Sequence, residues 1–168
     1  IDIFAGPGGL GEGFSSLRSG NGRALFKIAL SIEMEPYAHR TLLLRSFFRQ
    51  FPKSSVPGPY YEYLRGGSKS PRSLEELFRL FPEQADHATR EAWCEELRPA
   101  LAGETDRRIK AALGTARRNE AWGVVGGPPC QAYSLVGRSR MLKPMGEAFY
   151  SDKRHTLYKE YLRLLKGH

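Results

Sequence analysis

A glycine-rich turn near the start of the chain constrains its fold more than any other feature. The run IDIF, residues 1–4, is short and apolar like a buried strand, and residues 6–11 follow with the pattern G-x-G-x-x-G. An amphipathic segment then continues to Leu17, so the sequence predicts strand, tight turn and helix in succession. Such glycines let the backbone approach a ligand, and the unpaired N–H groups of the helix start favour an electronegative group. A tight turn without a ligand is the alternative.

An acidic residue follows the turn at a suitable distance. Ala24 to Ile32 is predicted to form a second strand, and Glu33 stands at its end. An acid about 20 residues after such a turn hydrogen-bonds ribose hydroxyls in dinucleotide-binding folds. The combination favours a nucleoside cofactor over an empty turn. It does not distinguish a dinucleotide from S-adenosylmethionine.

The remaining pattern alternates helices with strands. Trp122 to Gly126 is predicted to be a third strand, and residues 53–67, rich in Pro, Gly, Ser and Tyr, an irregular excursion. Helices are predicted from Glu35 to Phe51, over 74–81 with Ser73 as cap, and over 86–101, 106–118 and 152–165. This order predicts an α/β fold with a mostly parallel sheet.

Composition narrows the function classes. The net charge of +8 in 168 residues indicates either a basic surface or a polyanionic partner. Cys94 and Cys130 do not form a disulfide framework and suggest a reducing, cytoplasmic setting. The four histidines are scattered, so no metal site is expected. No apolar run approaches the roughly 18 residues of a membrane span, so no membrane partner is expected.

The segment GGPPCQAYS, residues 126–134, places a cysteine after a predicted strand. Pro128 and Pro129 fix two φ angles, and Gly126 and Gly127 permit close passage of a neighbour. The carboxyl end of a parallel strand is where open α/β sheets bind ligands. Cys130 is therefore a candidate nucleophile, provided that its pKa is lowered or a base lies nearby. Cys94, expected within a helix, is assigned the alternative role of an inert buried cysteine.

Four motifs in this order resemble the cytosine-5 DNA methyltransferases: DIFAGPGGLGEGF, SIEMEPYA, GGPPCQAYS and TLYKEYLRLL. The resemblance is dense over residues 1–40 and 121–165 and thin between them. It implies a Rossmann-like, S-adenosylmethionine-dependent methyltransferase fold. It also implies methyl transfer to carbon 5 of cytosine in double-stranded DNA through a covalent cysteine adduct, with the target base flipped out of the helix.

The resemblance assigns roles residue by residue. Cys130 would attack carbon 6 of cytosine, with Gln131 beside it. A loop over residues 134–140 would close on DNA, with Ser134 at its start and phosphate contacts from Arg138 and Arg140. Glu33 would bind the ribose and Met34 would pack near the adenine. The other residues expected at the cofactor are Phe4, Gly6, Gly8, Gly9, Leu10 and Pro128.

The chain also departs from the family pattern. It contains no Glu-Asn-Val segment, no Gln-x-Arg-x-Arg segment and no target-recognition domain. The acid that the family places after its third strand is unclear, with Asp86 and Asp106 as candidates, and residues 53–120 suggest an enlarged helical insertion. We therefore expect residues 1–168 to be the N-terminal part of a catalytic domain with an incomplete sheet. Alone it would methylate DNA poorly, and its open sheet edge would favour self-association.

Several alternatives remain open at this point. The same chemistry could serve a tRNA cytosine-5 methyltransferase. The glycine turn alone would also suit an NAD-dependent oxidoreductase, although that leaves Pro-Pro-Cys-Gln unexplained. A non-catalytic DNA-binding remnant is the third alternative. For a DNA methyltransferase, we expect a bacterial cytoplasmic protein associated with the nucleoid, in restriction–modification or in regulation.

Overall fold

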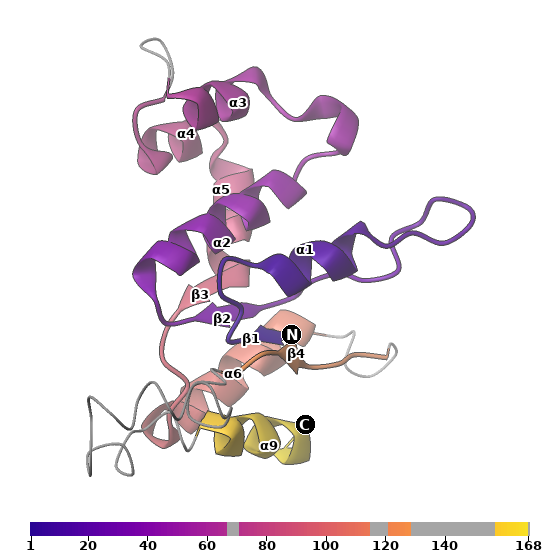
Figure 1. The fold of residues 1–168 in the computed structure, drawn as a ribbon, viewed down its shortest axis with the longest axis vertical. Coiled ribbons are helices and arrows are strands. Elements are labelled where there is room, and N and C mark those ends of the chain that lie inside the picture. Colours follow the sequence, from indigo (N-terminus) through magenta and orange to yellow (C-terminus); the bar gives the residue numbers. More distant parts are fainter. Residues whose placement is uncertain (67–70, 115–120, 129–156, 168) are drawn as a thin grey trace, which may run out of the picture.

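The computed structural model describes residues 1–66, 71–114, 121–128 and 157–167. Its centre is a parallel sheet in the order β3-β2-β1-β4 (Figure 1). The strands are β1 (Asp2–Ile3), β2 (Ser31–Glu33), β3 (Ala92–Cys94) and β4 (Val125–Gly126). All three pairings are parallel, with Ile3 opposite both Ile32 and Gly126. The predicted α/β fold with a parallel sheet is confirmed.

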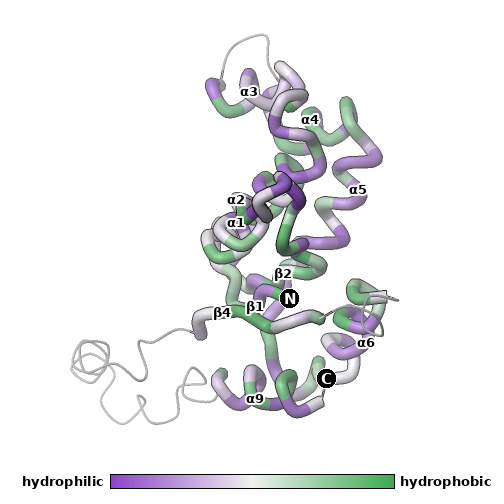
Figure 2. Tube along the Cα trace, turned by 90° about the vertical axis from the view of Figure 1, so that its right-hand side faces the viewer, coloured by the Kyte–Doolittle hydropathy of each residue, from purple (hydrophilic) through white to green (hydrophobic). Residues whose placement is uncertain are grey.

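Helices cover both faces of this sheet, as parallel strands require. α1 (Gly9–Ser16) and α2 (Pro36–Arg49) lie on one side, and α6 (Ala102–Leu113) and α9 (Leu157–Gly167) on the other (Figure 1). Hydrophilic and hydrophobic residues alternate along α6 in Figure 2, as expected of a helix with one buried face. Short 3-10 turns at Lys53–Ser55 and Pro99–Leu101 complete the connections around these helices.

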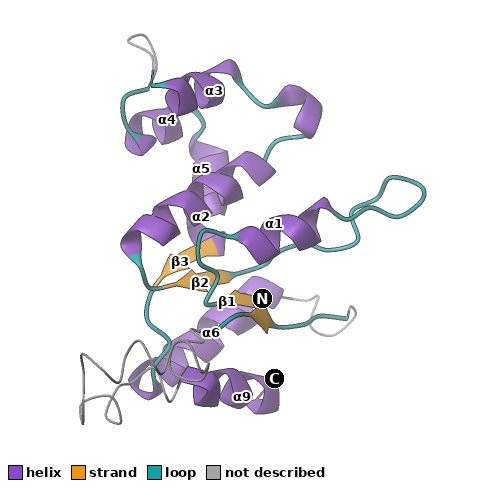
Figure 3. Ribbon diagram, viewed as in Figure 1, coloured by secondary structure: helices purple, strands orange, loops and turns teal. Residues whose placement is uncertain are grey.

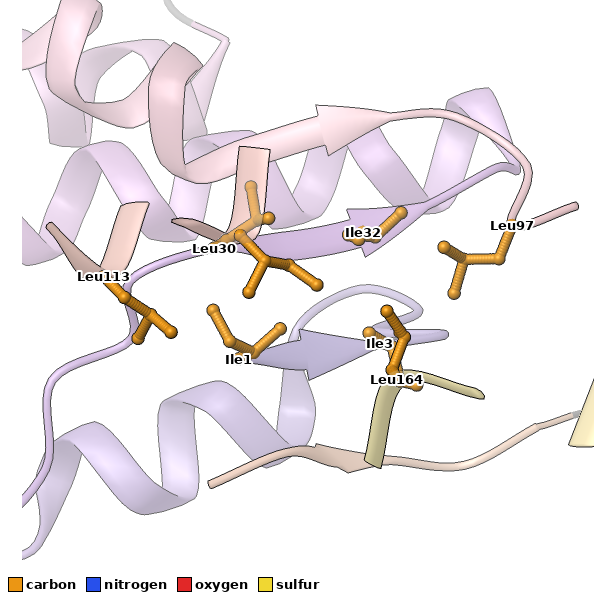
Figure 4. Packing of buried hydrophobic residues seen from close by; sticks show 8 residues of the cluster. Ile1, Ile3, Leu30, Ile32, Leu97, Leu113 and Leu164 are labelled. Atoms are coloured by element: carbon orange, nitrogen blue, oxygen red, sulfur yellow. The ribbon is translucent and has the colours of Figure 1, made fainter. Parts of the chain in front are cut away.

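The main core lies between the sheet and the layer of α6 and α9. Ile1 and Ile3 of the first strand region point to this side because successive strand side chains alternate between faces. Leu30 and Ile32 do the same from the neighbouring strand (Figure 4). The helices and their connections complete the cluster with Leu97, Ile109, Leu113 and Leu164. Each such buried side chain stabilises the fold by roughly 1.5–3 kcal/mol relative to an exposed one.

A second, aromatic core holds the helices that lie farther from the sheet. α3 (Gly58–Arg65), α4 (Leu74–Leu80) and α5 (Pro82–Glu91) pack with the second half of α2 (Figure 3). Phe47 of α2 is fully buried at its centre, with ring centroids 4.8 Å from Phe78 and 5.2 Å from Phe51. This aromatic core stabilises the packing of α3, α4 and α5 against α2.

The prediction of an irregular segment over 53–67 is wrong in its second half, where α3 forms. Pro59 lies in the first turn of this helix, where a missing N–H has no cost. Gly66 ends it in the left-handed conformation at φ 66°. Proline and glycine therefore mark the two ends of a helix here, rather than a loop.

The predicted helix over 86–101 is confirmed only up to Glu91 and is wrong beyond it. α5 ends at Glu91, and the next three residues form β3, paired in register with β2. Pairing buries Ala92 and places the Trp93 ring under the Arg108 guanidinium, 4.3 Å from the ring centroid. Short apolar runs do not distinguish strand from helix by spacing, so tertiary pairing decided the conformation.

The other predicted elements differ mainly in their bounds. Ser73 caps α4 by accepting the Glu76 N–H at 3.2 Å, as predicted. Of the predicted strand over 24–32, only residues 31 and 32 are in β2, and an antiparallel bridge joins Arg18 to Ala24. α6 begins four residues before its predicted start at Asp106. Among the described helices, none is both long and apolar enough to cross a membrane.

Candidate active site

Three predicted site segments leave the sheet at the same edge. β2, β1 and β4 are neighbours and run parallel, so their carboxyl ends lie side by side. Glu33 ends β2, the glycine turn follows β1, and Gly127 and Pro128 follow β4. The sequence places these segments up to about 120 residues apart, and the parallel topology brings them together.

Gly126 makes this close approach possible. A Cβ at Gly126 would overlap the carbonyl oxygen of Ile3 and would lie 2.8 Å from its Cγ1 atom. Only glycine therefore fits where β4 passes β1. At Gly127 the same test finds no atom within 4 Å, so the close passage expected of both glycines is required at the first alone.

The turn after β1 has a left-handed backbone at three positions. Phe4, Gly6 and Gly8 have φ values of 53°, 56° and 88°. For Phe4 this conformation costs about 1–2 kcal/mol, a strain that structures tolerate mostly at functional sites. Gly8 is also tightly packed, because an added Cβ would lie 2.9 Å from Leu42 Cδ1. Packing of Leu42 of α2 against Gly8 therefore leaves little space for the turn to shift.

Glu33 is fixed by two backbone groups. Its Oε2 accepts the Gly6 N–H at 2.7 Å, and its Oε1 accepts the Glu35 N–H at 2.8 Å. One carboxylate therefore joins the end of β2 to the glycine turn and to the start of α2. Each oxygen keeps a further lone pair, so the carboxylate can still accept hydroxyl donors from a ligand.

Several residues of the segments that meet at this end of the sheet are exposed or half-exposed. Leu10 and Met34 are 48% and 54% exposed, and Gly9 is exposed beside them. Pro128, on the neighbouring strand end, is half-buried. Tyr37, in the first turn of α2, is 84% exposed and was not among the predicted site residues. Exposed apolar side chains on segments that end beside a fixed carboxylate suit a ligand with one apolar and one hydroxyl-bearing part.

The remaining predicted site residues lie outside the described residues. They are Cys130, Gln131, Ser134, Arg138 and Arg140. Their roles therefore stay predictions. β4 does lead toward this segment from beside the glycine turn, since Gly126 pairs with Ile3.

Cys94 does not occupy the buried helical position that the sequence suggested. It is exposed at the end of β3 and lies opposite Glu33 in the sheet register. Burial raises the pKa of the Cys94 thiol, and the charges of Glu33, Glu95 and Glu35 raise it further. A thiol held in its protonated form is a poor nucleophile, so Cys94 is unsuited to covalent catalysis.

An acidic residue directly follows β3 in the structure. Glu95 follows β3 directly, and its N–H donates to the Glu33 carbonyl oxygen at 3.1 Å. Asp86 instead lies in α5 and pairs with Arg90 at 2.8 Å, and Asp106 lies in α6 and pairs with Arg163 at 2.9 Å. Neither earlier candidate is at the strand edge. The sequence analysis missed Glu95 because it predicted a helix there.

No group of three or more potential metal ligands forms within the part of the chain that the structure describes. The polar groups at the strand edge are carboxylate and backbone N–H, as a nucleoside-binding edge requires. No match to a family model and no match to a solved structure was found. Curated proteins, in contrast, do match.

The Type II methyltransferase M.Bpa9945I of Bacillus paralicheniformis is 34% identical over 176 aligned residues, which cover 98% of this chain. The chain is similar to Type II methyltransferases. A second relative, the Type II methyltransferase M1.HphI of Haemophilus parahaemolyticus, is 42% identical over 43 residues, or 26% of the chain. The chain spans 37% of the length of M.Bpa9945I and 10% of that of M1.HphI. The similarity supports a methyltransferase and agrees with the parallel sheet and the glycine turn.

Proposed function

We propose that this chain forms the cofactor-binding part of a DNA methyltransferase that modifies carbon 5 of cytosine. The observation that carries the proposal is the convergence of the glycine turn, Glu33 and the Pro128 segment on one sheet edge. Similarity to two Type II methyltransferases supports methyl transfer as the reaction class. The order of the motifs and the Pro-Pro-Cys-Gln segment favour carbon 5 over an amino nitrogen as the acceptor.

The residues present suit S-adenosylmethionine, which would supply an electrophilic methyl group. Glu33 would accept the ribose hydroxyls through its remaining lone pairs. The turn from Phe4 to Gly9 would pass under the amino-acid part, where its backbone can approach closely. Met34 and Leu10 would cover apolar surface of the adenosine, since both are about half exposed without it. Pro128 would border the methyl group from the neighbouring strand end.

Cys130 would provide covalent catalysis. Its thiolate forms a bond to carbon 6 of the flipped cytosine, and the electron pair of the 5,6 double bond moves to carbon 5. Carbon 5 would then accept the electrophilic methyl group that S-adenosylmethionine supplies when bound. A base removes the proton from carbon 5, and the returning electrons expel the Cys130 thiolate. Gln131 would lie beside the Cys130 nucleophile. Ser134, Arg138 and Arg140, in the loop over residues 134–140, would contact DNA.

A binding experiment tests the cofactor first. Calorimetric titration of the chain with S-adenosylhomocysteine and with NAD should give binding to the former alone, and Glu33→Ala should weaken it at least tenfold. That size follows from losing charge-assisted hydrogen bonds worth roughly 1.5–3 kcal/mol. NAD binding instead would favour an oxidoreductase and refute the methyltransferase proposal.

A trapping experiment tests the acceptor atom. DNA containing 5-fluorocytosine should form a covalent complex that survives denaturing electrophoresis, because fluorine cannot leave carbon 5 as a proton does. The longer enzyme that contains this segment is the reagent, with Cys130→Ser as control. Methylation of ordinary DNA without any trapped complex would indicate an amino nitrogen as the acceptor. Parallel assays on tRNA and duplex DNA identify the nucleic acid.

A further inference from the structure

Asp2 is a buried carboxylate on the side of the sheet opposite the main core. Because strand side chains alternate, Ile1 and Ile3 face α6 and α9, and Asp2 faces the layer of α1 and α2. Its side chain is 0% exposed, and neither carboxylate oxygen forms a hydrogen bond with a described residue. A buried polar group without a partner destabilises a fold, so its presence calls for an explanation.

This carboxylate lies directly against the first turn of α1. A Cβ at Gly11 would lie 3.2 Å from Asp2 Oδ2. The N-cap of α1 is Gly8, which offers no side chain to accept the free N–H groups of the first turn. A negative charge next to a helix N-terminus stabilises it. The Asp2 carboxylate of β1 therefore lies near the first turn of α1, where a helix normally has an N-capping side chain.

Polar and charged groups from three neighbouring elements act on Asp2. Burial raises the pKa of Asp2 to about 6. The Gly11 amide of α1 and the Arg49 guanidinium of α2 lower this pKa in part, and the Glu33 carboxylate of β2 raises it. The Gly11 amide thus acts on the carboxylate by proximity, although it makes no full hydrogen bond. Asp2 is mainly ionised at neutral pH and mainly protonated below its pKa.

A hydrogen bond joins the glycine turn to α1, since the Glu12 N–H donates to the Gly8 carbonyl oxygen at 3.0 Å. We propose that Asp2 is a positioning residue whose ionised carboxylate holds the first turn of α1, and with it the glycine turn, in the arrangement that binds the cofactor. Asp2 is too deeply buried to touch the ligand, so it acts through Gly11 and Gly8. The proposal rests on the proposed function, because it assigns the turn to S-adenosylmethionine.

The test is the pH profile of cofactor affinity. The affinity of the chain for S-adenosylhomocysteine is measured by calorimetry between about pH 5 and about pH 8. The affinity of the wild type should decrease about fivefold as the pH falls from 8 to 5, with a midpoint near pH 6. This is the size of effect expected when one anion near a helix N-terminus is neutralised. Asp2→Asn should bind as weakly as acidified wild type at every pH. The matched control is Ser31→Ala on the strand paired with Asp2, which removes a buried hydroxyl that makes no hydrogen bond with a described residue. It should follow the wild-type profile.

Each outcome decides the proposal. Equal affinities and equal pH profiles for wild type and Asp2→Asn would overturn it while leaving the proposed function intact. Should Asp2→Asn fail to fold, the wild-type profile decides alone, and an affinity unchanged across pH 6 would overturn the proposal. Absence of S-adenosylhomocysteine binding by wild type at every pH would refute the proposed cofactor, and the role of Asp2 with it.

Discussion

Gly8→Ala separates the two reasons for glycine in the turn. The added methyl group would meet two costs at this position. A left-handed φ of 88° disfavours alanine by about 1–2 kcal/mol. A Cβ 2.9 Å from Leu42 Cδ1 forces this fully buried leucine to shift, which typically costs 1–3 kcal/mol. We therefore expect a total loss of roughly 3 kcal/mol in the free energy of unfolding.

Two neighbouring glycines provide matched controls. Gly6 has φ 56° but no atom within 4 Å of an added Cβ, so Gly6→Ala should show only the backbone cost of about 1–2 kcal/mol. Gly9 is the first residue of α1 and also has open space, so Gly9→Ala should be neutral or slightly stabilising.

Urea denaturation followed by circular dichroism measures all three variants. In thermal denaturation of a domain of this size, a loss of 3 kcal/mol corresponds to a decrease of about 6–12 °C in the melting temperature. The expected order of stability is Gly9→Ala, then Gly6→Ala, then Gly8→Ala. Equal losses for Gly6→Ala and Gly8→Ala would show that Leu42 does not confine the turn, and would refute the packing argument.

Three further predictions follow from buried charges and from the exposed thiol. Arg49 pairs with Glu12 at 3.1 Å and with the buried Glu91. Arg49→Met should therefore lower the free energy of unfolding by about 3 kcal/mol in urea denaturation. Arg90→Met, which breaks an exposed pair with Asp86, should change the free energy of unfolding by less than about 1 kcal/mol. Burial raises the pKa of native Asp2 to about 6, whereas the ordinary pKa of an aspartate is 3.8. The native state therefore binds more protons between these values, and the unfolding free energy should fall as pH rises from 4 to 6, by at most about 3 kcal/mol. Asp2→Asn should abolish that slope in the wild-type-minus-variant difference, and an unchanged slope would assign it to other groups. Cys94→Ser should leave the proposed methyl transfer unchanged, since burial and the neighbouring carboxylates raise the pKa of this thiol, and a large loss of activity in a tritiated methyl-transfer assay would contradict this.

The glycine turn and Glu33 could be located from the sequence because their signals are local. A strand, a glycine pattern and a helix follow one another within 16 residues, and each requires only its immediate neighbours. Glu35 and Pro36 mark the start of α2 in the same way, and the Glu35 side chain accepts the Ala38 N–H at 2.6 Å. The family resemblance added roles for residues that local patterns leave open.

β3 could not be located in this way. Ala92, Trp93 and Cys94 form a strand because β2 offers them a parallel partner, and the sequence of either segment alone does not specify that pairing. The position of Glu95 at the site edge depends on the same pairing. The exposed setting of Cys94 and the missed helix α3 have related causes, since burial and helix packing are properties of the assembled chain.

The sequence by itself indicated the chemistry of each segment: the glycine turn, the acid about 20 residues later, and the cysteine after the last described strand. Local backbone sterics and side-chain chemistry are sufficient for that. Only the tertiary structure decided which strands are neighbours and which charges are buried. It brought Glu33 to Gly6, and it enclosed Asp2 beneath α1. These features depend on contacts between residues far apart in the chain, whose energies no local pattern contains.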